Sequence, residues 1–334
     1  MRPVGIVANP VSGKDVRRLL TYAGTSTLDD KVGVVRRVLI GAFEAGAHRF
    51  LVLPEPHGIV RRALATLPFC DHVEVGEAAP ARHHDERDTV TGAAAMRAAG
   101  CAAVVVLGGD GTNRAVVLGW PDVPVIPLST GTNNAFPTAT EATVAGAAAG
   151  HLATGLVAAE GVTAVAKVVC VALEGDAGDI ALVDAVLLRE RAGDRGSLKP
   201  FPPELLAVAV LTRAEPAAAG VSAIGGVLEP VSPEDDHGLV VHLAPPSRGR
   251  HGTVRALLAP GTYADVGIVG HRRLALGEDV TVEGPGLLAF DGDRRRVIDS
   301  DRRASLRVER SGPRVVDVAA VLGAEAVRSH RRRD

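Results

Sequence analysis

The first half of this 334-residue chain alternates apolar runs with stretches of helical periodicity. The runs predict buried strands over residues 4–8, 49–53, 72–75, 102–107 and 123–128. The periodic stretches predict helices over residues 28–47, 57–67, 85–99, 113–118 and 140–153. Such β–α alternation predicts an open, doubly wound parallel sheet. The run at 102–107 is apolar on both faces, as expected of its central strand, whereas Pro124 and Pro127 place the last strand near an edge or an end.

The pattern changes after about residue 160, where short β-branched runs are separated by Gly, Pro and Asp clusters. These runs predict strands over residues 162–173, 179–188, 240–243, 254–258, 266–269, 280–282, 287–290 and 304–308. Their spacing predicts an antiparallel sandwich or a barrel-like domain. We therefore expect a Rossmann-like α/β domain with an open parallel sheet over residues 1–158. A β-rich, sandwich-like domain is expected over 159–313, with a helix within 314–330 packed back on the first domain.

Composition and charge argue against several classes of protein. The net charge is -2, from 37 basic and 39 acidic residues, so no global attraction to nucleic acid is expected. The cysteines Cys70, Cys101 and Cys170 are odd in number and lack C-x-x-C spacing, which argues against a disulfide framework and a zinc knuckle. No signal peptide is visible, and no window approaches the roughly 20 apolar residues of a membrane span. We expect a cytoplasmic protein without a membrane span.

The segment Gly-Gly-Asp-Gly-Thr at residues 108–112 follows the predicted central strand and opens a helix. Ligands of open α/β sheets bind beyond the carboxyl ends of the strands. Glycines allow the backbone to approach a ligand closely, and a helix N-terminus offers N–H groups that suit an anion. The loop is therefore a candidate phosphate site, in which Asp110 either holds Mg²⁺ or accepts a proton from an attacking hydroxyl. A purely structural strand-to-helix turn is the alternative.

Two other phosphate-binding loops do not match the sequence. The dinucleotide fingerprint G-x-G-x-x-G requires a glycine at position 114, where the chain has Arg114. The P-loop pattern has no match, and the nearest segment, at 12–15, lacks its first glycine and its Ser or Thr. The acidic segment at 234–238 suggests a metal loop or, more simply, an exposed turn.

Three further segments are candidates for the same site. The polar loop at 129–137 suits hydrogen bonds to ribose, base or phosphate, or is a capped turn. The loop at 9–15 contains Lys14, which is either a phosphate ligand or a solvated lysine. The segment Phe-Asp-Gly-Asp-Arg at 290–294 is either a hairpin turn or a pair of acids that reaches the first domain.

Together these motifs resemble those of the NAD kinase and diacylglycerol kinase superfamily. The matching segments are Asn-Pro-Val-Ser-Gly-Lys-Asp at 9–15, Gly-Gly-Asp-Gly-Thr-Asn at 108–113, Pro-Leu-Ser-Thr-Gly-Thr-Asn-Asn-Ala-Phe-Pro at 127–137 and Phe-Asp-Gly-Asp at 290–293. The combination looks most similar to the acetoin catabolism protein X subgroup of ATP-NAD kinase-like proteins, over nearly the whole chain. The resemblance implies ATP-dependent, Mg²⁺-assisted phosphoryl transfer to a hydroxyl, and a homo-oligomer.

The resemblance also implies roles for individual residues. Asp110 is expected to be catalytic and close to the metal, and Asp293 corresponds to a late catalytic acid of the lipid kinases. The residues expected to bind the nucleotide are Asn9, Lys14, Gly108, Gly109, Gly111, Thr112, Asn113, Thr132, Asn133 and Asn134.

Three functions are compatible with these features. The main hypothesis is a kinase that acts on NAD or a related small metabolite. A lipid or polyol kinase is the second, although the aromatic content of 3% and the lack of an amphipathic membrane helix argue mildly against it. The third is a non-catalytic nucleotide sensor, because Asn113-Arg114 follows the glycine loop where lipid kinases carry Asn and Glu.

Overall fold

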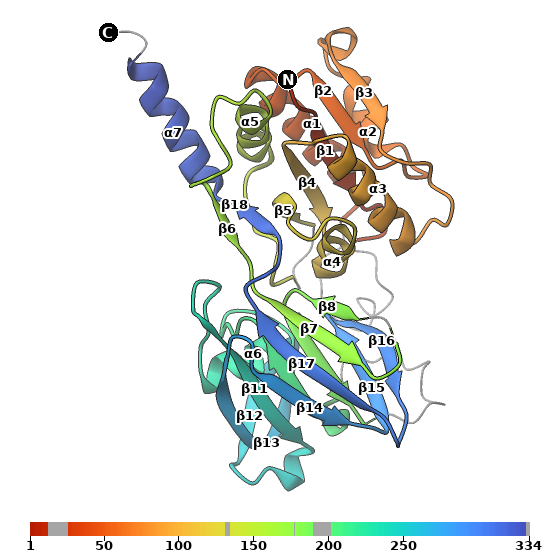
Figure 1. Ribbon diagram of the computed structural model, residues 1–334, viewed down its shortest axis with the longest axis vertical. Helices are drawn as coiled ribbons and strands as arrows, with labels where there is room; N and C mark the ends of the chain where they lie inside the picture. The colour runs from red at the N-terminus through yellow and green to blue at the C-terminus, as the bar shows by residue number, and fades with distance from the viewer. Residues whose placement is uncertain (13–25, 131–133, 177, 190–201, 332–334) are drawn as a thin grey trace.

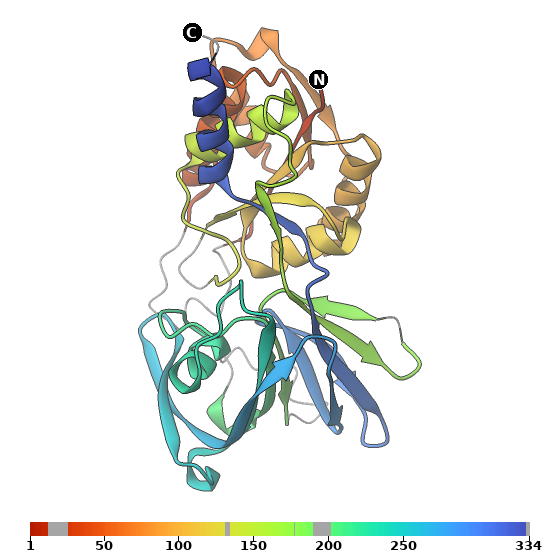
Figure 2. The ribbon, with the colours of Figure 1, turned by 60° about the vertical axis from the view of Figure 1, so that its left-hand side comes forward.

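The computed structural model of the chain has two parts that lie one above the other along the long axis (Figure 1). It describes residues 1–12, 26–130, 134–176, 178–189 and 202–331, without the side chains of 293–295 and 326–331. The first part contains most of the N-terminal half together with the C-terminal helix (Figures 1 and 2). Among the described residues, no helix is long and apolar enough to cross a membrane.

The first part is built on a sheet with the order β3-β2-β1-β4-β5-β18-β6. Its strands are β1 (Val4–Ala8), β2 (Arg49–Val52), β3 (Glu74–Glu77), β4 (Ala103–Gly108), β5 (Pro124–Ser129), β6 (Thr163–Val165) and β18 (Arg314–Val316). Among the described pairings within this sheet, only that of β6 with β18 is antiparallel. The strand order reverses at β1, which pairs with β2 on one side and β4 on the other. The predicted doubly wound α/β sheet is confirmed.

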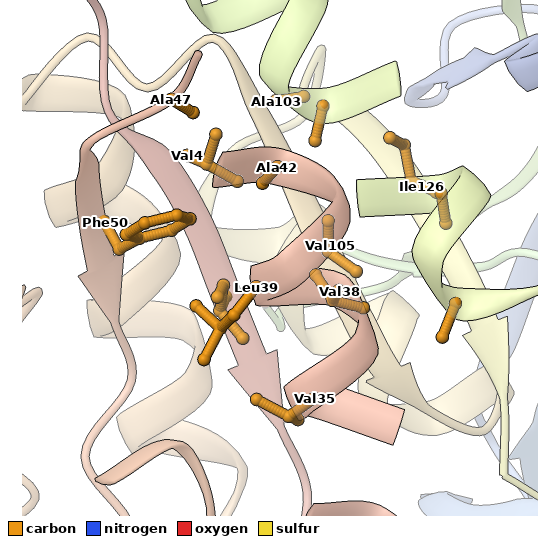
Figure 3. Packing of buried hydrophobic residues seen from close by; sticks show 14 of the residues in the cluster. Val4, Val35, Val38, Leu39, Ala42, Ala47, Phe50, Ala103, Val105 and Ile126 are labelled. Atoms are coloured by element: carbon orange, nitrogen blue, oxygen red, sulfur yellow. The ribbon is translucent and has the colours of Figure 1, made fainter. Parts of the chain in front are cut away.

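Helices cover both faces of this sheet. The apolar core on one face includes residues of α1 (Leu28–Glu44), α2 (Ile59–Leu64), α5 (Ala142–Ala153) and α7 (Val318–Arg331). The core on the other face includes residues of α3 (Glu86–Ala98) and α4 (Asp110–Gly119). Figure 3 shows Val35, Val38 and Leu39 of α1 in the same cluster as Phe50 and Val105 of the sheet. Alternate strand residues face opposite sides, so the central strands β1 and β4 contribute to both cores.

Close backbone packing compensates for the scarcity of large side chains in this part. Helix α1 lies against α5, and a Cβ atom on Gly41 would come within 1.9 Å of the Thr143 carbonyl oxygen. A Cβ atom on Gly146 would likewise lie 2.1 Å from the Val38 carbonyl oxygen. Only glycine permits two helix backbones to approach this closely.

The second part consists of two antiparallel sheets with the orders β12-β13-β11-β10-β9-β15-β16 and β14-β17-β7-β8. Their strands are β7 (Val168–Leu173), β8 (Asp179–Ala181), β9 (Asp184–Leu188), β10 (Leu206–Leu211), β11 (His237–Ala244), β12 (Thr253–Ala259), β13 (Thr262–Ala275), β14 (Asp279–Glu283), β15 (Gly286–Phe290), β16 (Asp293–Ile298) and β17 (Arg303–Glu309). Val171 and Leu306 of the smaller sheet share one core with Val210 and Leu288 of the larger. The predicted β-rich, sandwich-like architecture is confirmed.

Helix α6 (Val221–Leu228) packs on the other face of the larger sheet. Short 3₁₀ helices complete the set, at η2 (Cys70–His72), η3 (Pro203–Leu205) and η4 (Pro246–Arg248). The sequence did not predict β10 or α6.

Strand β5 corrects one expectation, because it lies inside the sheet between β4 and β18. Pro124 is tolerated because it is the first residue of the strand, and the register of the short β18 on β5 covers only Pro124 and Val125. Beyond that point β5 forms a bridge with Thr138 through the N–H groups of Ser129 and Thr138, so the missing N–H group of Pro127 costs this bridge no hydrogen bond.

The chain passes between the two parts twice, after β6 and before β18. The two crossings are hydrogen-bonded, from the Ala166 N–H group to the Pro313 carbonyl at 2.9 Å and from the Gly312 N–H group to the Ala166 carbonyl at 3.0 Å. Arg310, on the second crossing, donates to the carbonyls of Glu234 and Asp235, so the acidic segment at 234–238 is a turn held by a cation. The domain boundaries at residues 158 and 313 stay predictions.

Candidate functional site

The carboxyl ends of β1, β4 and β5 bring three of the predicted segments together. The Asn9 side-chain amide, directly after β1, donates to the Thr112 hydroxyl at 2.8 Å. The carboxylate of Asp110, after β4, accepts hydrogen bonds from the segment after β5 through the Ala135 N–H group. The junction of β1 and β4 is where the strand order reverses, and ligands of such sheets bind beyond the strand ends at this point.

The described part of the loop after β1, residues 9–12, is called the first loop. A buried lysine that the sequence did not indicate as a site residue holds it. The Lys31 side chain is fully buried in α1. Its ammonium group donates to the carbonyls of Asn9 at 2.9 Å, Pro10 at 2.8 Å and Ser12 at 2.6 Å. The Asn9 side-chain oxygen in turn accepts from the Val11 N–H group at 2.9 Å. An ammonium group has three donor hydrogens, and the loop offers three carbonyl acceptors to the Lys31 ammonium group.

The glycines of the loop after β4 are required because other residues lie very close to their backbone. A Cβ atom on Gly108 would lie 2.5 Å from the Thr112 Cβ atom, and one on Gly109 would lie 2.8 Å from the Asn134 side-chain oxygen. The Asn134 amide donates to the Ser129 hydroxyl at 3.1 Å, which fixes it against the loop. The glycines therefore let α4 begin beside the segment after β5.

Two more predicted nucleotide-binding residues belong to the first turns of α4. Gly111 lies in the first turn, half-buried beside Asp110. The Asn113 side chain is fully buried, and its amide donates to the Gly109 carbonyl at 2.9 Å. The buried Asn113 oxygen has no hydrogen-bond partner within the part of the chain that the structure describes. The Asn113 side chain therefore links the first turn of α4 to the glycine loop that precedes it.

Asp110 is the central charged group of this arrangement. Its carboxylate accepts hydrogen bonds from the Phe136 N–H group at 2.8 Å and from the Ala135 N–H group at 3.1 and 3.2 Å. Burial and, after it, the negative charge of Asp291 raise the pKa of Asp110 to about 7, although the two N–H groups and the charge of Arg213 act in the opposite direction. A carboxylate with a pKa close to neutrality can accept and release a proton under physiological conditions.

Two acids of the second part come within electrostatic reach of Asp110. Burial raises the pKa of Asp184 well above its ordinary value, and the charges of Asp291 and Asp110 add to this effect. One side-chain oxygen of Asp184 is buried and has no hydrogen-bond partner among the described residues. The Asp291 carboxylate accepts from the N–H groups of Leu182 at 2.9 Å and Val183 at 2.7 Å, while burial raises the pKa of Asp291 as well. Three carboxyl groups thus gather where the two parts meet.

The segment at 290–294 combines both of its predicted alternatives. Phe290 pairs with Asp293 across a two-residue turn, and the turn residues Asp291 and Gly292 both have positive φ, +49° and +82°. Positive φ at both positions is the geometry of a type I′ hairpin turn. The acid that acts on Asp110 is Asp291, whereas the sequence analysis selected Asp293. The side chain of Asp293 lies outside the described part of the structure, as do Lys14, Thr132 and Asn133 in full.

Arg213 is a second residue that the sequence analysis missed. It follows β10, and its Nη1 atom donates to the Ala135 carbonyl at 2.9 Å. Its guanidinium carbon lies 5.5 Å from the centre of the Phe136 ring. A cation of the second part therefore faces the same loop of the first part that binds Asp110.

Comparison with known proteins identifies the family. Residues 4–157 match the model of the ATP-NAD kinase N-terminal domain, and residues 167–311 match that of the acetoin catabolism protein X C-terminal domain. The chain is 37% identical over 335 residues to acetoin catabolism protein X of Cupriavidus necator, across 96% of this chain and 91% of that protein. The chain belongs to the acetoin catabolism protein X family. The resemblance inferred from the sequence motifs is confirmed.

A solved structure has the same overall fold as this member of the acetoin catabolism protein X family. It is yeast NADH kinase in complex with NADH, with a TM-score of 0.53 and 15% identity, over 95% of this chain and 83% of the yeast chain. The similarity extends over both parts and establishes a shared fold. The first half of this family member is thus a domain of the ATP-NAD kinase type.

Asp110 is the carboxyl group of this family member that could hold Mg²⁺. Within the described ranges, no group of three or more His, Cys, Asp and Glu side chains is arranged to hold a metal ion. Mg²⁺ in nucleotide sites needs only one or two carboxylates, because substrate phosphates and water complete its shell. Asp110 fits that requirement, since a carboxylate has about four acceptor sites and its N–H partners leave capacity for another ligand.

Proposed function

We propose that the chain is an ATP-dependent kinase that transfers a phosphoryl group to a hydroxyl of NAD or a related small metabolite. The observation that carries the proposal is Asp110, which lies at the carboxyl end of β4 and has a pKa of about 7. The match to the ATP-NAD kinase N-terminal domain supports this function, as does the fold shared with an NADH kinase. In the proposed reaction, Asp110 is the general base.

The residues of the first part divide the work as follows. The N-terminus of α4 and the first loop, which Asn9 joins to Thr112, hold the nucleotide phosphates. Asp110 accepts the proton of the acceptor hydroxyl while the new O–P bond forms and the bond from the γ-phosphorus to ADP breaks. Mg²⁺ bound with the nucleotide beside Asp110 would neutralise phosphate charge. Most of the rate enhancement then comes from positioning and charge.

Burial and the nearby carboxyl group of Asp291 keep Asp110 basic. A buried carboxylate with an ordinary pKa would be a weak base, since it would give up its proton far below neutrality. The negative charge of Asp291 opposes ionisation of Asp110 and so increases its affinity for a proton. The second part therefore contributes to the base although Asp110 belongs to the first.

An acceptor screen tests the proposed function. The chain is incubated with Mg²⁺–ATP and NAD, NADH, glycerol or vesicles that contain diacylglycerol, and ADP and phosphorylated product are quantified. We expect product with NAD or NADH and none with glycerol or diacylglycerol. Transfer to diacylglycerol would identify a lipid kinase instead, and tight ATP binding without transfer to any acceptor would identify a nucleotide sensor. A homo-oligomer and a cytoplasmic location stay predictions, the first of which light scattering tests.

A further inference from the structure

Arg213 belongs to the second part and contacts the dipeptide Ala135-Phe136 of the first part. Its side chain is only 12% exposed. The Nη1 atom donates to the Ala135 carbonyl at 2.9 Å, and the guanidinium lies 5.5 Å from the centre of the Phe136 ring. Arginine suits such a position, because its planar group donates in a fixed direction and stacks on an aromatic ring at the same time.

The same dipeptide binds Asp110 through its other polar groups. The Phe136 N–H group donates to the Asp110 carboxylate at 2.8 Å, and the Ala135 N–H group donates to both oxygens of that carboxylate. Arg213 therefore holds the Ala135 carbonyl and the Phe136 ring. The Phe136 N–H group, which belongs to the same peptide unit as that carbonyl, orients Asp110. A shift of the dipeptide would move both N–H groups relative to Asp110.

The energetics argue against a role for Arg213 in stability alone. Burial lowers the pKa of the Arg213 guanidinium, which shows that the folded chain bears a cost for its charge, partly offset by Glu215 and Asp110. Glu215 is 3.9 Å from its Nη1 atom, a weak pairing. The Nε atom is buried without a hydrogen-bond partner within the described part of the chain. A residue with such incomplete compensation stabilises the fold poorly.

We propose that Arg213 is a positioning residue for phosphoryl transfer, which holds Ala135 and Phe136 from the second part and thereby orients Asp110. The inference rests on the proposed function of Asp110 as the base. It adds that the catalytic geometry is complete only when both parts of the chain are in contact. In this proposal Arg213 acts through the dipeptide, because its Nη1 atom contacts the Ala135 carbonyl and its guanidinium lies over the Phe136 ring.

Steady-state kinetics of Arg213→Ala and Arg213→Lys with ATP and NAD test the proposal. Arg255→Ala is the matched control, since Arg255 also lies over an aromatic ring in the second part, 6.0 Å from the Tyr263 ring centre, but its side chain is 67% exposed on β12. For Arg213→Ala we expect kcat to fall about 100-fold with KM changed about twofold or less. Arg213→Lys should recover about tenfold, since an ammonium group can still donate to the Ala135 carbonyl. A kcat equal to that of Arg255→Ala, or a rise in KM alone, would overturn the proposal.

Amide hydrogen exchange provides a readout that does not depend on activity. In Arg213→Ala we expect the Ala135 and Phe136 amides to exchange about tenfold faster, while those of β1 stay protected. Unchanged exchange at 135 and 136, or faster exchange throughout both parts, would contradict a positioning role. If the wild-type chain transfers no phosphoryl group to any acceptor, the proposed function fails. The exchange rates then still decide whether Arg213 holds the dipeptide, so the two failures are distinguishable.

Discussion

After burial, the charge of Asp291, in the turn after β15, is the largest influence that raises the pKa of Asp110 at the start of α4, although the two residues belong to different parts of the molecule. Asp291 itself is fixed by the N–H groups of Leu182 and Val183. The relation makes the proton affinity of the proposed base depend on how the second part lies against the first.

The pH dependence of the reaction should reflect this relation. A general base works in its deprotonated form, so kcat/KM should rise about tenfold per pH unit below neutrality and level off above an apparent pKa of about 7. Asp291→Asn removes the neighbouring charge and should move the rising limb about one unit lower. Asp265→Asn, which changes a half-exposed acid on β13, is the control. An unchanged limb in Asp291→Asn would contradict the coupling.

Asp110 should also reduce stability at alkaline pH. Its pKa is raised from 3.8 in the unfolded chain to about 7 in the folded one, so the folded state binds the proton more tightly. The stabilising contribution is complete below about pH 4 and is lost as the pH rises through 7. Asp110→Asn should therefore increase the free energy of unfolding by about 2 kcal/mol at pH 8 and by much less at pH 5. Urea unfolding at both pH values measures the difference, and an equal effect at both would refute the assignment.

Arg114 should be among the most sensitive positions in the chain. Its side chain is 3% exposed and donates to Glu86 at 2.6 Å, to the Ile180 carbonyl at 2.7 Å and to Asp179, thereby joining α4 to α3 and β8. Arg114→Met removes a buried charged donor from Glu86, Asp179 and the Ile180 carbonyl, and should reduce the free energy of unfolding by about 3–5 kcal/mol. Arg87→Met removes an exposed pair with Asp85 and should cost about 1 kcal/mol or less. Similar losses in the two variants would contradict this account.

Substitution of two buried lysines should distinguish an effect on the first loop from an effect on overall stability. Lys31 binds three carbonyls of the first loop, while Lys167 binds the carbonyls of Ser232 at 2.9 Å and His237 at 2.7 Å in the second part. Both Lys31→Met and Lys167→Met should destabilise the fold by roughly 2–3 kcal/mol, because buried carbonyls lose charged donors. We expect ATP binding to weaken about tenfold only in Lys31→Met, as measured by calorimetry. Equal binding by the two variants would show that the first loop does not contact the nucleotide.

Much of the fold could be predicted because its strands carry local signals. Strand β1 is a continuous apolar run ended by Asn-Pro, and β4 is one ended by Gly-Gly. Strand β10 is a continuous apolar run of the same kind, so its local signal was present although the strand was not predicted. Helix α6 was missed because the adjacent Gly225 and Gly226 lower its helix propensity.

The site was predictable only where a motif follows a strand. Asn9, Asp110 and Asn134 were expected at one sheet edge because the carboxyl ends of parallel strands meet there. Asp184 and Arg213 come from the second part, and no local pattern indicates that the fold brings them to Asp110. Lys31 did carry a signal, because a lysine four residues before Val35 lies on the apolar face of α1.

The central claim is that Asp110 is the base of a phosphoryl transfer. The most direct test compares wild type, Asp110→Asn and the exposed control Asp122→Asn, with the γ-phosphoryl group followed from ATP to NAD by phosphorus NMR and ATP binding followed by calorimetry. We predict that Asp110→Asn binds ATP within about threefold of wild type while transfer falls about 10³-fold, and that Asp122→Asn changes neither. Transfer by Asp110→Asn at the wild-type rate would contradict the account.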